Sequence, residues 1–453
     1  MKTFRWIVAT GWMALSVWGA DVPARTVPWA GRPLTLTEAL NWALAQNAEV
    51  RKARQDLEAA TGVAIQTRAV ALPRLEGNAG YTVREQGGVE QFPVPGLPIQ
   101  IPNDNWSAGI RLVQTVYGGG RLTSAWRSAR LTEQQARAAY DTAVAETVLA
   151  VRTAYADVLL AAEMVRVHEA SVQLLEEELR QTRQRFEAGT VPRFNVLRAQ
   201  VELANARPRL IRAQNSLRIA RQQLAQLLGF DVPSEFSDDL PLEPADHLQP
   251  PESKPDLAAG LKQALNRRSE LAMLRHAESL QAEAVRQALA GYKPALEVFA
   301  GYDVHSPTFR DELDRGIGGW LAGAQVRWSF FDGGSTRGRV LEARSKQERV
   351  RVELEDLRRR IELEVRTAYS RLMEAHEVLA STAKVQEEAE EALRLAQARY
   401  AAGTGTQLDV LSAQTALTEA RSIHVQALRD CVVAQARWER AVGLPVMEAE
   451  SQP

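Results

Sequence analysis

The residues that most often carry chemistry are scattered through this sequence of 453 residues rather than gathered into motifs. The six histidines form no His-Glu-x-x-His motif and repeat no metal-ligand spacing, which is typical of solvated surface residues. Cys431 is the single cysteine, and its Ala- and Val-rich surroundings indicate a small core residue rather than a nucleophile. No Gly-x-x-x-x-Gly-Lys loop is present to bind a nucleotide phosphate. We therefore predict no enzymatic activity, no metal and no cofactor.

The charged residues give no catalytic or nucleic-acid-binding pattern either. Carboxylate runs such as Glu176–Glu178 lie in helical sequence with basic neighbours, so we interpret them as solvated faces with intrahelical ion pairs. The 55 Lys and Arg residues nearly balance the 56 Asp and Glu residues. No global positive field is left to hold a nucleic-acid backbone, and we exclude nucleic acid as a partner.

The N-terminal residues predict export. Lys2 and Arg5 precede an apolar run from Trp6 to Trp18, and small residues follow it, which is the pattern of a signal peptide at 1–24. The pattern does not fix the cleavage site. No later stretch reaches 18 uninterrupted apolar residues, so we expect an exported protein without a membrane-spanning helix.

The sequence contains an internal duplication with an offset of 214 residues. Residues 151–155 recur at 365–369, and the segment 185–190 corresponds to 399–404. We expect two structural repeats separated by a proline-rich acidic linker and followed by a short tail. The predicted bounds are 25–230 for the first repeat, 231–256 for the linker, 257–444 for the second repeat and 445–453 for the tail.

Each repeat is expected to contain one very long helix. No proline and no glycine occurs from Arg121 to Glu187, and apolar residues recur there at intervals of three and four. In the second repeat the corresponding helix is expected from Ser335 to Ala401, a stretch in which no proline occurs. A glycine-containing break follows each long helix, and a return helix is then expected to reach residue 228 in the first repeat and residue 442 in the second. Each long helix and its return helix should form a coiled-coil hairpin about 100 Å long. A further helix is expected near 36–65.

Before each long helix the apolar period changes to two, which predicts amphipathic strands. The alternation covers 106–116 and 320–330, each preceded by a shorter partner at 75–83 and 296–304. Such strands match the wall of a membrane β-barrel. Trp106, Trp320 and Trp328 are expected on its outward face. Four strands cannot close a barrel in lipid, so chains must pool their strands.

The duplicated tips carry a resemblance to a known family. Arg-Phe-Glu-Ala-Gly-Thr at 185–190 and Arg-Tyr-Ala-Ala-Gly-Thr at 399–404 are each followed by a Val-Leu and Ala-Gln pattern. Together with the glycine turns at 117–120 and 331–334, they make the mature chain resemble the TolC-type outer-membrane efflux proteins. The resemblance implies a mainly α fold with a membrane β-barrel, in which a homotrimer in outer-membrane lipid extends a periplasmic helical barrel toward a periplasmic adaptor and an inner-membrane transporter.

The resemblance also implies functional positions. Tyr400 and Asp409 match residues that close the periplasmic end of the pore, whereas Gly405 replaces the family's arginine, and Asn195 and Ser412 replace aspartates. The adaptor-docking tips implied by the match are Gly189, Thr190, Val191, Gly403, Thr404 and Gly405.

The function expected from these features is a passive outer-membrane exit duct for a tripartite efflux or type I secretion system of a Gram-negative-type bacterium. The alternative is a periplasmic or surface coiled-coil scaffold without channel activity.

Overall fold

The structure is a computed structural model. The residues that it describes are 32–85, 104–230, 240–250, 255–306 and 316–444. The predicted signal peptide and C-terminal tail lie outside these ranges.

The two sequence repeats have the same order of elements: two helices, two strands, a long helix and a return helix. The first repeat comprises α1 (Leu36–Gln46), α2 (Ala48–Ala69), β1 (Arg74–Val83), β2 (Asp104–Tyr117), α3 (Arg121–Glu187) and α4 (Arg193–Leu227). The second comprises α5 (Leu257–Arg267), α6 (Ser269–Leu289), a short 3-10 turn η3 (Ala290–Tyr292), β3 (Ala295–His305), β4 (Ile317–Arg327), α7 (Ser335–Ala401) and α8 (Gln407–Val442).

The long helices α3 and α7 begin and end where the sequence predicts. Each starts after a glycine in the left-handed region, Gly120 at φ 103° and Gly334 at φ 87°, where other residues would be strained. The preceding Gly119 also needs its small size, because a Cβ there would lie 2.8 Å from Cβ of Lys293. The glycine turns therefore set the angle at which the strands enter the helices.

The single helix expected near 36–65 is instead two helices. Asn47 separates them, and its side-chain oxygen accepts a hydrogen bond from the N–H of Glu49 at 2.8 Å, which caps α2. Its side-chain amide donates to the carbonyl of Leu227 at 2.7 Å. The break thus depends on a contact with the far end of α4, which the local apolar pattern does not contain.

The four strands form one antiparallel sheet in the order β1-β2-β3-β4. The register places Tyr81 opposite Trp106 and Tyr302 opposite Trp320, so aromatic residues share the apolar face. The predicted extent of the last strand is wrong, because β4 ends at Arg327. Trp328 lies beyond it, and its indole N–H donates to the carbonyl of Tyr292 at 3.1 Å.

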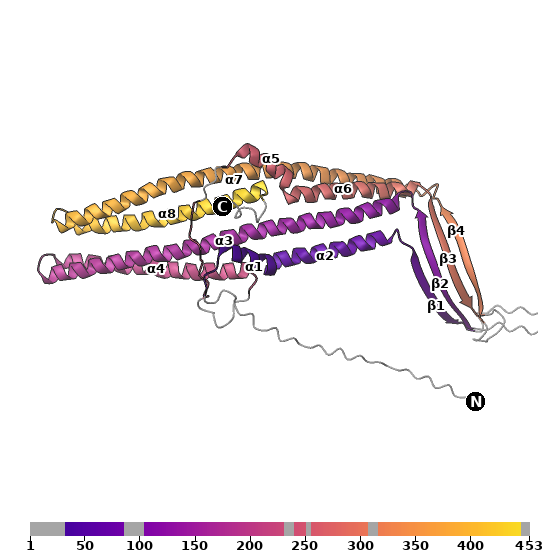
Figure 1. The fold of residues 1–453 in the computed structure, drawn as a ribbon, viewed down its shortest axis with the longest axis horizontal. Helices are drawn as coiled ribbons and strands as arrows, with labels where there is room; N and C mark the ends of the chain where they lie inside the picture. Colours follow the sequence, from indigo (N-terminus) through magenta and orange to yellow (C-terminus); the bar gives the residue numbers. More distant parts are fainter. Residues whose placement is uncertain (1–31, 86–103, 231–239, 251–254, 307–315, 445–453) are drawn as a thin grey trace, which may run out of the picture.

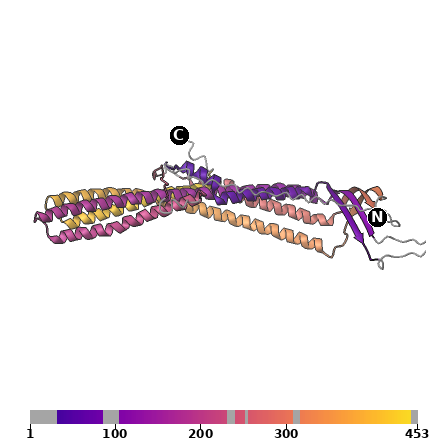
Figure 2. The ribbon, with the colours of Figure 1, turned by 90° about the horizontal axis from the view of Figure 1, so that it is seen from below.

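The helices lie lengthwise, with the sheet at one end and both hairpin tips at the other (Figure 1). The helices α2 and α6 accompany the half of α3 and α7 nearer the sheet, whereas α4 and α8 accompany the half nearer the tips (Figure 1). The hairpins α3–α4 and α7–α8 lie side by side and touch through α3 and α8. The turned view in Figure 2 shows the same slender arrangement. Among the described helices, none combines the length and the apolar character needed to cross a membrane.

Part of the predicted linker belongs to the core of the first repeat. Leu240 and Leu242 are buried in a cluster that also contains Val151 and Leu224. Leu34 forms an isolated parallel bridge with Pro244, so the linker backbone lies beside the start of the first repeat. This described stretch therefore packs rather than simply spanning the distance between repeats.

Candidate pore and docking site at the hairpin tips

Both tips use the same backbone reversal. In the first, the N–H of Thr190 donates to the carbonyl of Arg185 at 2.9 Å, and Gly189 has φ 74°. In the second, Thr404 donates to Arg399 at 2.9 Å, and Gly403 has φ 75°. This is the Schellman end of a helix, in which the left-handed residue is normally glycine. The side-chain hydroxyl of each threonine also donates to the same carbonyl, so two hydrogen bonds from one threonine hold each turn.

The remaining tip positions differ between the repeats. Val191 is followed by Pro192, which precedes α4 in extended conformation without a side-chain cap. At the matching place Gly405 donates its N–H to the carbonyl of Arg399 at 3.0 Å. A Cβ at Gly405 would lie 3.1 Å from the nitrogen of Tyr400. The arginine of the family pattern would therefore not fit this turn without a shift of the backbone.

Tyr400 lies between the two hairpins. The guanidinium of Arg185, on α3, lies over its ring at 4.5 Å from the centroid. The Tyr400 hydroxyl is buried and has no hydrogen-bond partner among the described residues. Its ring packs against the cluster of Leu393, Val410 and Leu417. Tyr400 therefore joins the tips through its ring face and not through its hydroxyl.

Asp409 caps the helix that carries it. Its carboxylate accepts a hydrogen bond from the N–H of Thr406 at 2.9 Å, and its own N–H donates to the Thr406 hydroxyl at 3.2 Å. These bonds, with the Thr406 backbone bond as the largest cause, lower the pKa of Asp409 below its ordinary value. The side chain is exposed, so a stable negative charge stands at the start of α8. Of the two positions that replace family aspartates, Asn195 is half-buried and Ser412 is exposed.

A polar cluster between α3 and α8 was missed by the sequence interpretation. Glu178 is not on a solvated face as expected but is only 8% exposed, because α8 lies against it. The side-chain amide of Gln407 donates to Glu178 at 3.3 Å and to the hydroxyl of Thr182 at 2.9 Å. The run of three glutamates gave no signal for this difference, since it becomes visible only when α8 is placed beside α3.

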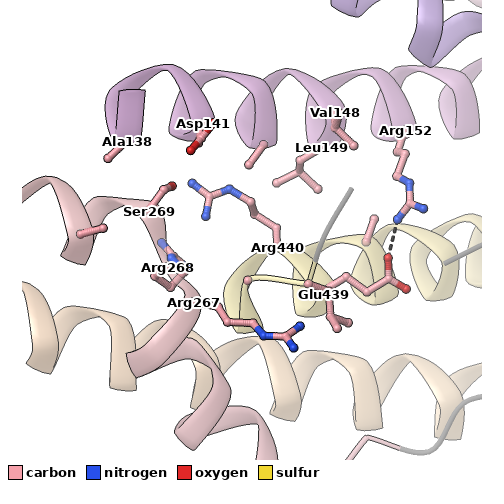
Figure 3. Close-up of a pocket in the computed structure, with 15 residues that line it drawn as sticks. Ala138, Asp141, Val148, Leu149, Arg152, Arg267, Arg268, Ser269, Glu439 and Arg440 are labelled. Atoms are coloured by element: carbon pink, nitrogen blue, oxygen red, sulfur yellow. Dashed lines mark hydrogen bonds and ion pairs between the residues drawn. The ribbon is translucent and has the colours of Figure 1, made fainter. Parts of the chain in front are cut away.

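The crevice between α3, the α5–α6 corner and the end of α8 is lined by arginines (Figure 3), and three of them, Arg152, Arg268 and Arg440, have carboxylate partners in the same chain. Arg152 pairs with Glu439, and Arg440 pairs with Glu270. Arg268, almost fully buried, binds Glu270 at 3.1 Å and Glu364 at 3.0 Å. These pairs fasten the corner to the long helices, so the crevice is a structural joint. Cys431 is fully buried nearby on α8, as predicted for a core residue.

A family model described as "Outer membrane efflux protein" matches residues 39–230 and 260–444, which is most of the chain and both repeats. The chain belongs to the outer membrane efflux protein family. Outer membrane protein TolC of Escherichia coli (strain K12) is 26% identical over 414 residues, covering 88% of this chain and 80% of that protein. Cobalt-zinc-cadmium resistance protein CzcC of Cupriavidus metallidurans is 26% identical over 430 residues and covers 91% of each chain.

Solved structures of outer-membrane channels share the fold of this family member. The outer membrane protein VceC from Vibrio cholerae matches with a TM-score of 0.76 at 20% identity, over 90% of this chain and 96% of that chain. The outer-membrane channel OprN matches with a TM-score of 0.75 at 20% identity, over 91% and 90%. The family and the mainly helical fold predicted from the duplicated tips are thereby confirmed. This outer membrane efflux protein is an exit duct of efflux or secretion systems.

Proposed function

We propose that this outer-membrane duct works as a homotrimer in a tripartite export system. A periplasmic adaptor and an inner-membrane transporter deliver the substrate and supply the energy, and the duct conducts passively. The observation that carries the assembly is the sheet, in which β1 and β4 each leave one edge unpaired among the described strands. Open edges are not tolerated in lipid, and three copies of a four-stranded sheet would close one barrel. Its apolar face would contact outer-membrane lipid.

The internal repeat indicates where a second copy binds. Within the chain, α8 packs on α7 and on α3, and its Leu411 and Val433 are 4% and 3% exposed. The positions 214 residues earlier, Leu197 and Ile219 on α4, are 49% and 46% exposed, because α4 packs mainly on α3 alone. If α7 of a neighbouring copy covers α4 as α3 covers α8, the hairpins alternate around a closed ring.

The charges of α4 and of the tip half of α7 favour this contact. The helix α4 carries seven arginines and one glutamate. On α7, the segment 374–391 carries six glutamates and one lysine. Both stretches lie in the half of the hairpin nearer the tip, so they would meet at the same level. Exposed Val378 and Val385 on α7 would supply apolar contacts between the charges.

In this assembly the six tip residues Gly189 to Val191 and Gly403 to Gly405 form the adaptor-facing end. They lie at the end of the molecule opposite the sheet, and their glycines allow the tight reversals described above. Tyr400 and Asp409 lie beside these tips and would border the periplasmic entrance of the pore. The cation contact of Tyr400 and the exposed charge of Asp409 support that role.

The seam between copies is tested by a matched pair of substitutions. Ile211 on α4 and Ile423 on α8 are both exposed, but the flank of α8 is already covered by α3 of the same chain. Ile211→Asp should leave monomers in native mass spectrometry of detergent-extracted protein, whereas Ile423→Asp should remain trimeric. Trimers in both variants would show that α4 is not the seam.

The duct in a tripartite system is tested by export in cells that lack the native protein. The parent chain should restore export only when the adaptor and transporter encoded with it are also present, and the mature protein should stay with outer membranes after carbonate extraction. Release of the protein by carbonate would favour the coiled-coil scaffold instead.

A further inference from the structure

An aromatic ring lies on the polar face of the sheet. The register places Phe299 opposite Val113 and Arg111 opposite Gly301. Because side chains alternate along a strand, Arg111 and Phe299 lie on the face opposite that of Trp320. In the proposed barrel the Trp320 face contacts lipid, so Arg111 and Phe299 face the interior. A phenylalanine there departs from the polar lining that is typical of such barrels.

The ring of Phe299 is held in place by the strands on both sides of β3. From β2, the guanidinium carbon of Arg111 lies 4.6 Å from the centroid of the ring. On β4, a Cβ at Gly323 would come within 2.7 Å of the Cζ atom of Phe299, so the ring lies over that glycine. The stacked pair therefore has a fixed orientation across three adjacent strands.

Two neighbouring positions complete an amphipathic surface. Gly301 lies between Arg111 and Leu321 in one row of the register, and it has no side chain that would separate them. Glycine is required there, because a Cβ would lie 2.8 Å from the carbonyl oxygen of Ile110. The side chain of Leu321 is exposed. We call Arg111, Phe299 and Leu321 the lumenal patch.

The guanidinium of the lumenal patch is free to bind an anion. Arg111 is exposed, and among the described residues its side chain forms no hydrogen bond and no ion pair, even with Glu76, which lies opposite it on β1. A guanidinium that stacks on a ring still presents N–H donors at its edge. The patch thus places cation, aromatic and aliphatic groups side by side.

We propose that the lumenal patch binds small aromatic anions, which carry a carboxylate or sulfonate on a planar ring. The guanidinium of Arg111 binds the anionic group, and Phe299 and Leu321 contact the ring. The site rests on the proposed function, because closure of the barrel places one patch from each copy around the duct. Binding at this open surface is weak and rapidly reversible, as conduction requires.

Arg327 provides a matched control for charge. It lies on the same face of the sheet, opposite Ala295, and it is exposed. Within the described part of the chain it has neither an ion pair nor a ring contact. Attraction by charge alone would make Arg111 and Arg327 equally important, whereas the lumenal patch requires Arg111.

The test measures binding of naphthalenedisulfonate to the detergent-purified protein by equilibrium dialysis. Ethanedisulfonate has the same charge without a ring, and it should bind the parent at least about tenfold more weakly. Arg111→Gln and Phe299→Leu should each weaken naphthalenedisulfonate binding about five- to tenfold, whereas Arg327→Gln should change it less than about twofold. Glu76→Gln removes the carboxylate opposite Arg111 and should strengthen binding.

Planar-bilayer recordings give the second readout. Naphthalenedisulfonate should reduce the current of the parent and of Arg327→Gln, and Arg111→Gln and Phe299→Leu should relieve this block. Equal effects of Arg111→Gln and Arg327→Gln, or equal binding of the two disulfonates, would overturn the lumenal patch. A parent that neither forms trimers nor conducts would overturn the proposed duct instead, and dialysis would still decide the patch because one chain contains all of it.

Discussion

Arg185 and Tyr400 join the two hairpins at their tips, with the guanidinium carbon 4.5 Å from the centre of the phenol ring. The arginine comes from the first repeat and the tyrosine from the second. The two residues occupy neighbouring places in the repeated tip motif, since Arg399 is the counterpart of Arg185 and Phe186 that of Tyr400. The contact therefore joins the arginine of one copy of the motif to the aromatic residue of the other copy.

Substitutions at Tyr400 should separate the role of its ring from that of its hydroxyl. Tyr400→Ala loses the cation–π contact and the apolar packing, which together are worth about 1–3 kcal/mol, and channel opening should become more frequent. Tyr400→Phe keeps the ring and removes a buried hydroxyl that has no partner among the described residues, so conductance should match the parent within error. Frequent opening of the phenylalanine variant in bilayer recordings would show that the hydroxyl matters.

Asp409 should affect selectivity as well as the start of α8. Asp409→Asn keeps a side chain that can cap the helix but removes the charge, and it should lower cation selectivity in bilayers if three copies border the pore. Thr406→Ala removes the other half of the capping box and should loosen α8 without changing selectivity. Unchanged reversal potentials in Asp409→Asn would assign Asp409 to capping alone.

The capping contribution of Asp409 should depend on pH in one direction. Its pKa is lowered in the folded protein, so the ionised carboxylate stabilises the helix start at pH values above the ordinary carboxyl range. The contribution is lost as the pH falls through the folded-state pKa. Hydrogen exchange at Thr406 should therefore be constant near neutral pH, after correction for the intrinsic rate, and should rise only in acid. A rise near neutral pH would contradict this assignment.

The tip glycines should be intolerant of side chains. Gly403 has φ 75°, so Gly403→Ala should cost about 1–2 kcal/mol and distort the adaptor-facing end. The expected result is lost export with protein still present in the outer membrane. Gly338→Ala, on α7 near the sheet, is the matched control because a Cβ there meets no atom within 4 Å. Full export by Gly403→Ala would remove the docking role from this turn.

Tyr155 should be important for stability, and its repeat counterpart should not be. The Tyr155 hydroxyl lies 2.8 Å from the carbonyl oxygen of Leu34 and 2.7 Å from the carboxylate of Asp246. Tyr155→Phe should cost about 1–3 kcal/mol, measured by denaturant unfolding in detergent. Tyr369→Phe should cost less than about 0.5 kcal/mol, because the ring of Tyr369 packs edge-on against Trp438 and a phenylalanine ring keeps that contact. Equal losses in the two variants would contradict this difference.

The sequence predicts the local features of this fold well. The bounds of α3 and α7 follow from long stretches without proline between glycine-containing turns, and the apolar face of the sheet follows from strict alternation. The break at Asn47 and the burial of Glu178 were not predicted, since both depend on helices distant in sequence, α4 and α8. The roles of Tyr400 and Asp409 came from the family resemblance, and the contact between Arg185 and Tyr400 required the two hairpins to be placed side by side.

The bridge between Leu34 and Pro244 has a consequence for how the chain evolved and folds. The first repeat completes its core with Leu240 and Leu242, which follow its last helix in the chain. When translation has only reached the end of α4, the two leucines that complete the core of the first repeat have therefore not yet been made. The ancestral half cannot be recovered by cutting the chain at the end of α4. A split protein would have to be divided after residue 250 for its first fragment to keep a complete core.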